Sequence, residues 1–229
     1  MKKISIVIPA CNEEKCIEKT VTDISDNFRN AQIIVVCNGC TDRTYEVARK
    51  TKRPNVEVVN FHERIGKGGA ILEGFKVAAG DIVGFVDADG SFRTEDIQKI
   101  VNNLDKYDAV IGSKWEGRGF FEVQSGFMRK IGSRGWNFLA KSLADSDFKD
   151  TQAGLKFFRQ KVIDHLLKED FICRGFDFDV ELLYKIKKAD FKIKEIYVPI
   201  EDGGKSTFDM KNSPQMLVNL LKFYFSKND

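Results

Sequence analysis

The feature that most limits the possible folds is an alternation of short apolar runs and helical patterns along the first half of the chain. In the intervening stretches, apolar residues recur at helical spacing, as they do between Ile17 and Phe28. The four runs, which read as strands, occupy residues 4–8, 33–36, 56–59 and 82–86. Strands separated by helices predict an α/β fold with a mostly parallel sheet and helices on both faces.

The second half continues this pattern less regularly. Residues 113–136 are rich in Gly, Arg and aromatic residues and are expected to form a long loop that enters a helix near Met128. Helices are also expected at residues 94–104 and 180–187 and from Pro214 onward, and strands at 108–111, 154–158 and 193–200. No linker or repeat interrupts the chain, so we expect one domain over residues 1–229.

Charge and apolar content argue against several classes of protein. The net charge is only +3, and 37 basic residues are mixed with 34 acidic ones, so no nucleic-acid partner is expected. No apolar run approaches the roughly 20 residues that cross a bilayer, and Met1-Lys2-Lys3 does not begin a signal peptide. A cytoplasmic location is therefore expected.

The cysteines leave two interpretations open. Five cysteines in a cytoplasmic chain argue against a disulfide framework. Cys37 and Cys40 form a C-x-x-C between a strand and a helix, and Cys11 and Cys16 follow the neighbouring strand, so a redox pair or a zinc site is conceivable. Ordinary buried thiols are the simpler interpretation, because the C-x4-C spacing is loose.

Two aspartates follow the fourth strand, at the sheet edge where ligands of parallel α/β proteins bind. Asp87 and Asp89 are two residues apart, so they face the same side, and a turn at Gly90 lets both approach one hard cation. A solvated turn is the alternative for this tripeptide alone. Candidate ligand-binding groups at the other strand ends favour a site, and they lie at residues 9–13, 37–41 and 62–69.

Two of these segments also have simpler explanations. Residues 64–70 offer backbone N–H groups and cations at a helix N-terminus, which suits phosphate. The segment lacks the Walker A spacing and the dinucleotide fingerprint, so an ordinary glycine turn explains it equally well. Asn12 is expected to cap the helix that follows the first strand, and Thr94 the helix after the fourth.

In their order along the chain, these segments resemble the family 2 glycosyltransferases of the GT-A fold, especially the dolichyl-phosphate glucosyltransferases and mannosyltransferases. The resemblance runs from about residue 4 to 208. Its motifs are Pro9 with Asn12-Glu13-Glu14, Gly66–Ala70, Asp87–Gly90, Gly112–Lys114, Ser133–Asn137, Asp150–Gly154, Phe176–Tyr184 and Gly204–Ser206. The resemblance implies a Rossmann-like GT-A domain with a nucleotide-sugar half (1–112), an acceptor half (113–210) and a C-terminal helix (211–229).

The resemblance also implies a function and a set of site residues. The reaction would be an inverting transfer of a hexose from a UDP- or GDP-sugar to a polyprenyl (dolichyl) phosphate, with Mg²⁺ or Mn²⁺ held by Asp87 and Asp89. Asp89 and Arg134 would be the catalytic residues. The nucleotide sugar would lie against Pro9, Ala10, Glu13, Asn38, Lys67, Asp87 and Ala88. The acceptor phosphate would meet Arg129, Arg134 and Lys205.

One motif departs from the family pattern. Where the family usually reads Asp-Asp-Gly-Ser, this chain reads Cys37-Asn38-Gly39-Cys40. The Asn38 amide can accept a hydrogen bond from a base through its oxygen and can also donate through its NH₂ group. The choice between uridine and guanosine therefore stays open.

The acceptor also stays open at this point. A phosphomonoester has a second pKa of about 6 and is already anionic at neutral pH, so a lipid phosphate needs no strong general base. A hydroxyl acceptor needs one, for which Asp177, Asp179 and Glu181 are candidates, although acidic residues also suit a helix N-terminus. A protein that binds a nucleotide sugar without transferring it is a third possibility, because Asn38 and Ser91 replace more usual residues.

Contact with a membrane surface is a further hypothesis. Aromatic and apolar residues of the long loop and the last helix, with flanking lysines, form the kind of amphipathic stretch that lies on a bilayer. These residues are Phe120, Phe121, Phe127, Met128, Lys222, Phe223, Tyr224, Phe225 and Lys227. Packing on the protein's own core or on a second subunit is the alternative interpretation.

Overall fold

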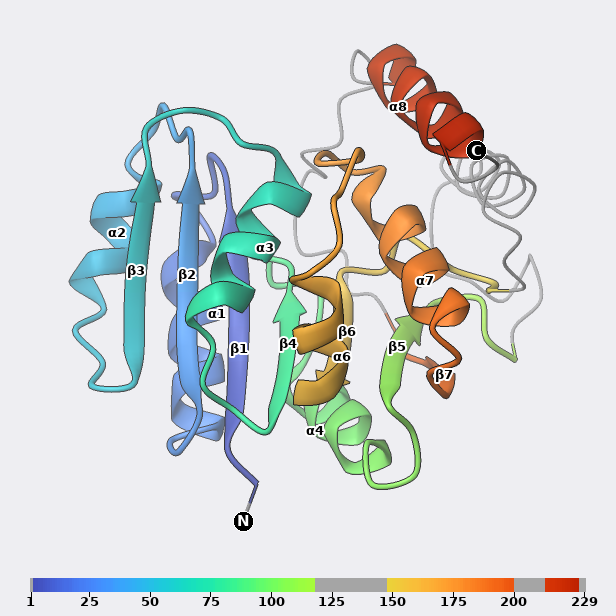
Figure 1. Ribbon diagram of the computed structural model, residues 1–229. Coiled ribbons are helices and arrows are strands. Elements are labelled where there is room, and N and C mark those ends of the chain that lie inside the picture. The colour runs from blue at the N-terminus through green and yellow to red at the C-terminus, as the bar shows by residue number, and fades with distance from the viewer. Residues whose placement is uncertain (1, 118–147, 200–212, 227–229) are drawn as a thin grey trace.

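The computed structural model describes residues 2–117, 148–199 and 213–226, which contain one seven-stranded sheet (Figure 1). The strands are β1 (Ile4–Ala10), β2 (Gln32–Asn38), β3 (Val56–Phe61), β4 (Ile82–Val86), β5 (Ala109–Ser113), β6 (Leu155–Arg159) and β7 (Ile193–Tyr197). The helices are α1 (Ile17–Asn27), α2 (Thr44–Lys50), α3 (Lys67–Val77), α4 (Thr94–Asn103), α6 (Gln160–Leu166), α7 (Phe178–Lys188) and α8 (Ser213–Ser226).

The sheet is parallel except for one strand. Its order is β3-β2-β1-β4-β6-β5-β7, and only β6 runs antiparallel to its neighbours, β4 and β5. The remaining pairs, including β5 with β7, are parallel. The predicted mostly parallel α/β fold is therefore confirmed. The sheet runs without interruption from one edge to the other, so one hydrogen-bonded layer joins early and late parts of the described chain.

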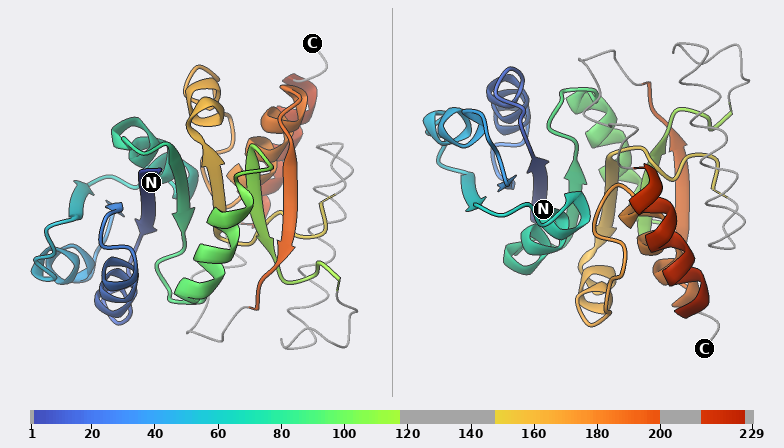
Figure 2. Two further views of the ribbon diagram at one scale, coloured as in Figure 1. Left: turned by 90° about the horizontal axis from the view of Figure 1, so that it is seen from below. Right: turned by 90° about the horizontal axis from the view of Figure 1, so that it is seen from above.

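Helices cover both faces of the sheet, as the periodicity predicted (Figure 2). Successive residues of β1 point to opposite faces, so Ile6 belongs to the core that also contains residues of α1, α2 and α4, whereas Val7 belongs to the core with residues of α3, α6 and α7. The second face also contains three phenylalanine rings with centroids 6.0 to 6.5 Å apart, those of Phe75, Phe85 and Phe158. These two cores fix the sheet and therefore the positions of the strand ends.

Two predicted helix caps are wrong. Asn12 has a φ of 60° and its side-chain oxygen accepts a hydrogen bond from the Thr41 backbone N–H at 2.8 Å, so it joins two loops instead of capping α1. The helix itself begins at Ile17, and no side chain caps it. Thr94 is the first residue of α4 and not its cap, which is Arg93.

The predicted strands in the second half are present with shifted bounds. β5 begins one residue later than expected. β7 was expected to reach Ile200 but ends at Tyr197, and Val198 and Pro199 lie outside the strand. The helix expected near Met128 lies outside the described residues. No described helix has the length and apolar character of a membrane span.

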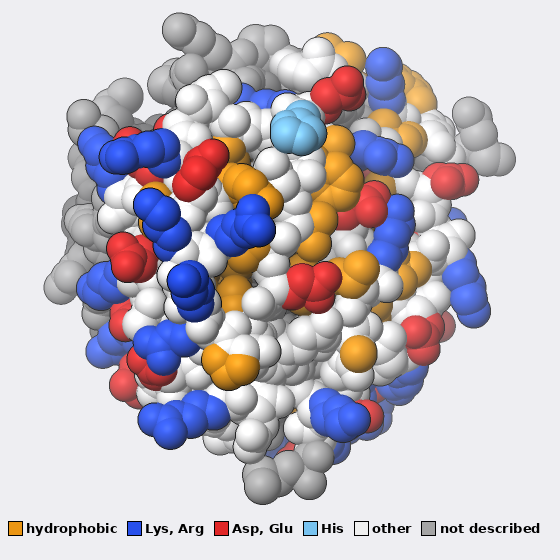
Figure 3. Space-filling view, turned by 90° about the vertical axis from the view of Figure 1, so that its left-hand side faces the viewer, with side chains coloured by type: hydrophobic (Ala, Val, Ile, Leu, Met, Phe, Trp, Pro, Cys, Tyr) orange, Lys and Arg blue, Asp and Glu red, His pale blue; other side chains and the backbone are white. Residues whose placement is uncertain are grey.

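One edge of the sheet is formed by β3 and the other by β7. On the face that carries the β3 edge, basic and acidic side chains are interspersed and neither sign forms a continuous field (Figure 3). The exposed Glu57 on β3 places a charge on the strand that has no further partner in the sheet. A charged edge strand of this kind discourages edge-to-edge association.

Candidate functional site

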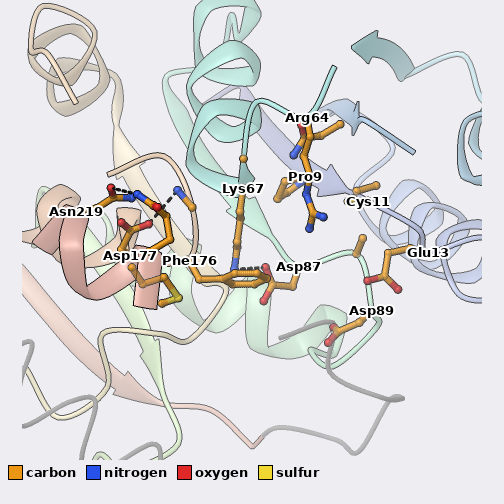
Figure 4. Close-up of a pocket in the computed structure, with 17 residues that line it drawn as sticks. Pro9, Cys11, Glu13, Arg64, Lys67, Asp87, Asp89, Phe176, Asp177 and Asn219 are labelled. Carbon is orange, nitrogen blue, oxygen red and sulfur yellow. Dashed lines mark hydrogen bonds and ion pairs between the residues drawn. The ribbon is translucent and has the colours of Figure 1, made fainter. Parts of the chain in front are cut away.

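A cavity of about 320 Å³ opens where the carboxyl ends of β1, β2 and β4 meet the N-terminus of α3 (Figure 4). Ligands of open parallel sheets bind at this edge. The lining residues come from six parts of the chain. They are Pro9, Ala10, Cys11, Glu13, Asn38, Arg64, Gly66, Lys67, Asp87, Ala88, Asp89, Gly175, Phe176, Asp177, Gln215, Met216 and Asn219.

Lys67 and Asp87 form an ion pair in the middle of this cavity. The Lys67 ammonium lies 2.6 Å from Oδ1 of Asp87, and the lysine side chain is only 13% exposed. Burial alone would lower the pKa of Lys67, but the negative charges of Asp87 and Asp179 outweigh it and raise that pKa. Lys67 is therefore firmly cationic, and its ammonium also lies 5.7 Å from the centre of the Phe176 ring.

Asp87 is positioned by Gly154, the residue directly before β6. Its backbone N–H donates to the carbonyl oxygen of Gly154 at 2.9 Å. A Cβ atom on residue 154 would overlap the Asp87 carboxylate, so only glycine leaves that carboxylate in place. The residue that leads into the antiparallel strand thus positions the aspartate that follows β4.

Glu13 and Asp89 bring further negative charge to the same cavity. Burial raises the pKa of Glu13, a hydrogen bond from Cys16 opposes this effect, and the neighbouring charges of Asp89 and Asp87 add to it. Oδ1 of Asp89 accepts a hydrogen bond from the Ser91 backbone N–H at 3.0 Å. The carboxylates of Asp87 and Asp89 lie in the same cavity, and carboxylate oxygens are ligands that suit a hard divalent ion.

Asn38 lines the cavity beside the segment that contains Arg64 and Ile65. Its side-chain oxygen accepts a hydrogen bond from the Ile65 backbone N–H at 2.7 Å, and the residue is 3% exposed. This bond fixes the segment that leads into α3, so the oxygen already has a protein partner. The exposed Arg64 guanidinium also lines the cavity (Figure 4).

The start of α3 is locked to the segment before α7. The backbone N–H groups of Gly68 and Gly69 both donate to the carbonyl oxygen of Arg174, at 2.9 and 3.3 Å. Gly66 has a φ of +82°, and a Cβ atom there would overlap the same carbonyl. Glycine is therefore required at residue 66 both for its backbone conformation and for this close approach.

The structure brings together every described residue that was predicted to bind the nucleotide sugar or the metal, whereas the candidate bases Asp179 and Glu181 do not line the cavity. Pro9, Ala10, Glu13, Asn38, Lys67, Asp87, Ala88 and Asp89 all line the one cavity. Their individual roles stay predictions. Arg129, Arg134 and Lys205, predicted to bind the acceptor phosphate, lie outside the described residues.

Sequence reasoning did not single out the α8 residues that line the cavity. Gln215, Met216 and Asn219 reach it, and Gln215 Nε2 donates to Asn219 Oδ1 at 2.9 Å. The only signal was their i, i+4 spacing on a helix whose apolar face was already recognised. Asp177 was considered solely as a general base, and its place in the cavity was not foreseen.

The thiols do not form a metal cluster. Within the described ranges, which include all five cysteines, no group of three or more His, Cys, Asp or Glu residues is arranged to hold a metal ion. Cys16 Sγ donates instead to Glu13 Oε2 at 3.1 Å. Cys40 is half-buried, and a hydrogen bond from the fully buried Cys37 lowers its pKa to about 6 despite the opposing effect of burial.

Known proteins share this sequence pattern. The family model described as "Glycosyl transferase family 2" matches residues 5–167. The chain is 29% identical to "Glycosyltransferase AglD" of Haloferax volcanii, but it spans only about a third (34%) of that protein while 91% of this chain is aligned. It is 30% identical to dolichyl-phosphate beta-glucosyltransferase ALG5D of Trichomonas vaginalis, with 96% of this chain and 72% of that protein covered. A third relative, "UDP-N-acetylglucosamine--dolichyl-phosphate N-acetylglucosaminyltransferase" of Methanococcus voltae, is 28% identical and is covered over 94% of its length by 97% of this chain.

Solved structures share the fold. Glucosyl-3-phosphoglycerate synthase of Mycobacterium tuberculosis superposes with a TM-score of 0.74 at 20% identity, over 96% of this chain and 80% of that one. Its complex with Mn²⁺, UDP-glucose and phosphoglyceric acid gives a TM-score of 0.72 at 21% identity, over 97% and 80%. The family match covers well over half of the chain, and the fold agrees with it. The chain therefore belongs to glycosyl transferase family 2 and is a glycosyltransferase.

Proposed function

We propose that this chain transfers a hexose from a UDP-sugar to a polyprenyl phosphate, with inversion at the anomeric carbon. The observation that carries the proposal is one cavity lined by all seven residues predicted to bind the nucleotide sugar, together with the predicted metal ligand Asp89. The names of two relatives supply the acceptor class, dolichyl phosphate. UDP is favoured because one relative's name and the similar solved complex both contain a UDP-sugar.

The donor would lie along the cavity with its base at the Pro9, Asn38 and Arg64 end. Because the Asn38 oxygen already accepts from Ile65, its NH₂ group is the donor available for a carbonyl oxygen of the base. The Arg64 guanidinium and the Lys67 ammonium supply positive charge along the path of the diphosphate. This orientation leaves the sugar at the end of the cavity formed by α7 and α8.

The carboxylates fit a Mg²⁺ or Mn²⁺ ion, which Asp87 and Asp89 would hold together with diphosphate oxygens. Such an ion would neutralise the charge that develops on the departing nucleoside diphosphate. Lys67 holds Asp87 in position through their ion pair. The acceptor phosphate is anionic at neutral pH, so its oxygen attacks the anomeric carbon from the side opposite the diphosphate without a strong base.

Binding and turnover test this proposal separately. Thermal shift with UDP and GDP, each with and without Mn²⁺, identifies the base and the metal requirement. Asp89→Asn should abolish transfer of sugar to polyprenyl phosphate while the melting temperature stays within a few degrees of the parent. Asp23→Asn, on the exposed face of α1, is the matched control and should retain full activity. Transfer at parental rate by the Asp89 variant would remove that residue from the mechanism.

Arg134 provides a separate test of the acceptor. An Arg134→Ala variant should lose transfer to polyprenyl phosphate far more than hydrolysis of the donor, because the guanidinium is proposed to bind only the acceptor. Equal loss of both activities would contradict that role.

The outward face of α8 supports contact with a membrane surface. Met216, Leu220 and Phe223 of this helix are buried against the protein, and the Phe223 ring lies 5.1 Å from that of Tyr184. The opposite side exposes large apolar residues over two turns, with exposed fractions of 40 to 64%. They are Leu217, Val218, Leu221 and Phe225. Since α8 also lines the cavity, a helix seated in the bilayer surface would bring the site to a lipid-borne phosphate.

Liposome flotation tests the membrane contact. Protein with Leu221→Glu and Phe225→Glu should float less with anionic vesicles than the parent, whereas Leu167→Glu, an exposed apolar residue beyond the end of α6, should float normally. Equal flotation of all three proteins would show that α8 is not the contact.

A further inference from the structure

One carboxylate oxygen in the residues that line the cavity lacks a hydrogen-bond partner. Asp177 is fully buried, and its Oδ1 accepts a hydrogen bond from the Gly175 backbone N–H at 3.0 Å. Its Oδ2 is also buried and has no partner in the described structure. Buried polar atoms in native proteins are almost always paired, so an orphaned carboxylate oxygen in the wall of a cavity indicates a bound donor group.

The protein supplies only a weak donor next to Asp177. The thiol of Cys173 lies against the carboxylate, and burial, then the charges of Asp177 and Glu181 and hydrogen bonds to their side chains, raise the pKa of this thiol. A thiol is at best a weak donor. Lys67, whose ammonium lies in the middle of this cavity, is paired with Asp87 instead. Among the described residues no strong donor reaches Oδ2, which leaves this oxygen available to a donor group of a bound ligand.

Asp177 is held firmly where it stands. It occupies the N-cap position of α7, and the segment before it is fixed by the bonds from Gly68 and Gly69 to Arg174. The Phe176 carbonyl oxygen accepts from Gln152 Nε2 at 3.1 Å. A group that cannot swing away to find solvent is suited to recognise a ligand by position.

The place of Asp177 in the cavity indicates which part of the donor it meets. Asp87 lies in the middle of the cavity, with Pro9, Cys11 and Arg64 to one side and Asp177 and Asn219 to the other (Figure 4). With the base at the first side and the diphosphate at Asp87, as proposed above, the sugar ring reaches the second. Sugar hydroxyl groups donate to a carboxylate and accept from amides, and both kinds of group are present there, in Asp177 and the α8 residues Gln215 and Asn219.

We propose that Asp177 is a specificity-determining residue, whose Oδ2 accepts a hydrogen bond from a ring hydroxyl of the donor sugar. The inference rests on the proposed function, because it takes the orientation of the nucleotide sugar from it. A hydrogen bond between a hydroxyl and a buried carboxylate is charge-assisted, and its loss lowers kcat/KM about 100-fold. Sites built in this way reject analogues that lack the hydroxyl, because the protein group is then left unpaired.

The test compares donors that each lack one ring hydroxyl, using the parent and Asp177→Asn. In the parent, one deoxy donor should lose about 100-fold in kcat/KM relative to the complete donor. In the variant the same deoxy donor and the complete donor should differ by less than about threefold, while the other deoxy donors keep their parental ratios. Asp164→Asn, on the exposed side of α6, is the matched control and should leave every ratio unchanged. Ratios that are the same in parent and variant would overturn the proposal.

Equilibrium binding separates this inference from the proposed function. Calorimetry should show that Asp177→Asn leaves UDP affinity unchanged and weakens UDP-sugar affinity roughly tenfold or more. If UDP affinity falls equally, Asp177 supports the cavity as a whole and the inference is wrong. If UDP-sugar affinity is unchanged and turnover alone is lost, Asp177 acts as a general base and the inference is also wrong. If the parent binds neither UDP nor any UDP-sugar, the proposed function itself fails.

Discussion

A buried ion pair behind the cavity gives the sharpest prediction for stability. Lys156 Nζ lies 2.7 Å from Oδ1 of Asp179, and the two side chains are 0% and 2% exposed. The ammonium also donates to the Ala153 carbonyl oxygen at 2.6 Å and lies 5.4 Å from the centre of the Phe85 ring. Lys156→Met keeps most of the side-chain volume, removes the cation and leaves a buried carboxylate without its partner.

The expected loss follows from what is left unpaired. Breaking a buried pair from one side costs about 3–5 kcal/mol, because the remaining charge is desolvated and uncompensated. For a domain of this size that corresponds to a fall of roughly 6–20 °C in melting temperature. The double variant Lys156→Met/Asp179→Leu removes both charges, so it should lose only the hydrogen bond to Ala153, about 1–2 kcal/mol.

Urea unfolding followed by circular dichroism measures both losses. Lys161→Met is the matched control, since Lys161 Nζ also lies 2.7 Å from a carboxylate, that of Asp108, but its side chain is 57% exposed. Its loss should stay below about 1 kcal/mol. The reasoning is refuted if Lys156→Met loses no more than this control, or if the double variant is as unstable as the single one.

Three further predictions follow from the same geometry. Gly154→Ala should displace the Asp87 carboxylate and weaken Mn²⁺ binding about tenfold, measured as a smaller thermal shift with UDP and Mn²⁺; an unchanged shift would contradict this arrangement. Gly66→Ala should destabilise the fold well beyond Gly117→Ala, because both glycines have a positive φ but only a Cβ atom at residue 66 would overlap another backbone atom. Gly117→Ala should therefore show only the cost of the backbone conformation, about 1–2 kcal/mol in urea unfolding. Equal losses in the two variants would contradict the overlap at residue 66. A hydrogen bond from Cys37 lowers the pKa of Cys40 to about 6, so the rate at which iodoacetamide alkylates Cys40 should rise through pH 6 and level off above about pH 7. A rate that still rises at pH 9 would show that Cys40 is an ordinary thiol.

The first half of the fold could be predicted because its signals are local. The strand expected at 82–86 matches β4, and each of the other three early strands is two or three residues longer than expected. Buried parallel strands are apolar on both faces, so their runs stand out from the helices between them. The Asn12 cap failed because this side chain bonds to the Thr41 loop, a partner that local spacing does not encode, whereas the Thr94 prediction missed the start of α4 by one residue.

The direction of β6 could not be read from its residues. Leu155 to Phe158 would form an equally apolar strand in either orientation, and only the pairing of β6 with β4 and β5 reveals that it is reversed. Lys156 would be assigned to an exposed face by alternation alone, yet it is fully buried because Asp179, 23 residues later, supplies its counter-charge. Pairing over such a distance is a tertiary effect.

The site was predictable where it lies at strand ends and not where it lies on helices. Asp87 and Asp89 follow a strand directly, so the rule for parallel sheets located them. Asp177, Gln215 and Asn219 reach the cavity only because α7 and α8 pack beside it, and the i, i+4 spacing on α8 does not reveal that packing. The orphaned oxygen of Asp177 is likewise visible only once its surroundings are known.

The reversed strand also limits how this enzyme can be divided or flexed. Strand β5 ends at Ser113, but both of its neighbours in the sheet, β6 and β7, come from later in the chain. In a fragment that stops after β5, this strand would therefore have no neighbour to pair with, and β4 would lose its pairing with β6. Splitting the gene near residue 113 should yield two insoluble pieces, and any opening of the enzyme during turnover must take place in segments that leave the sheet.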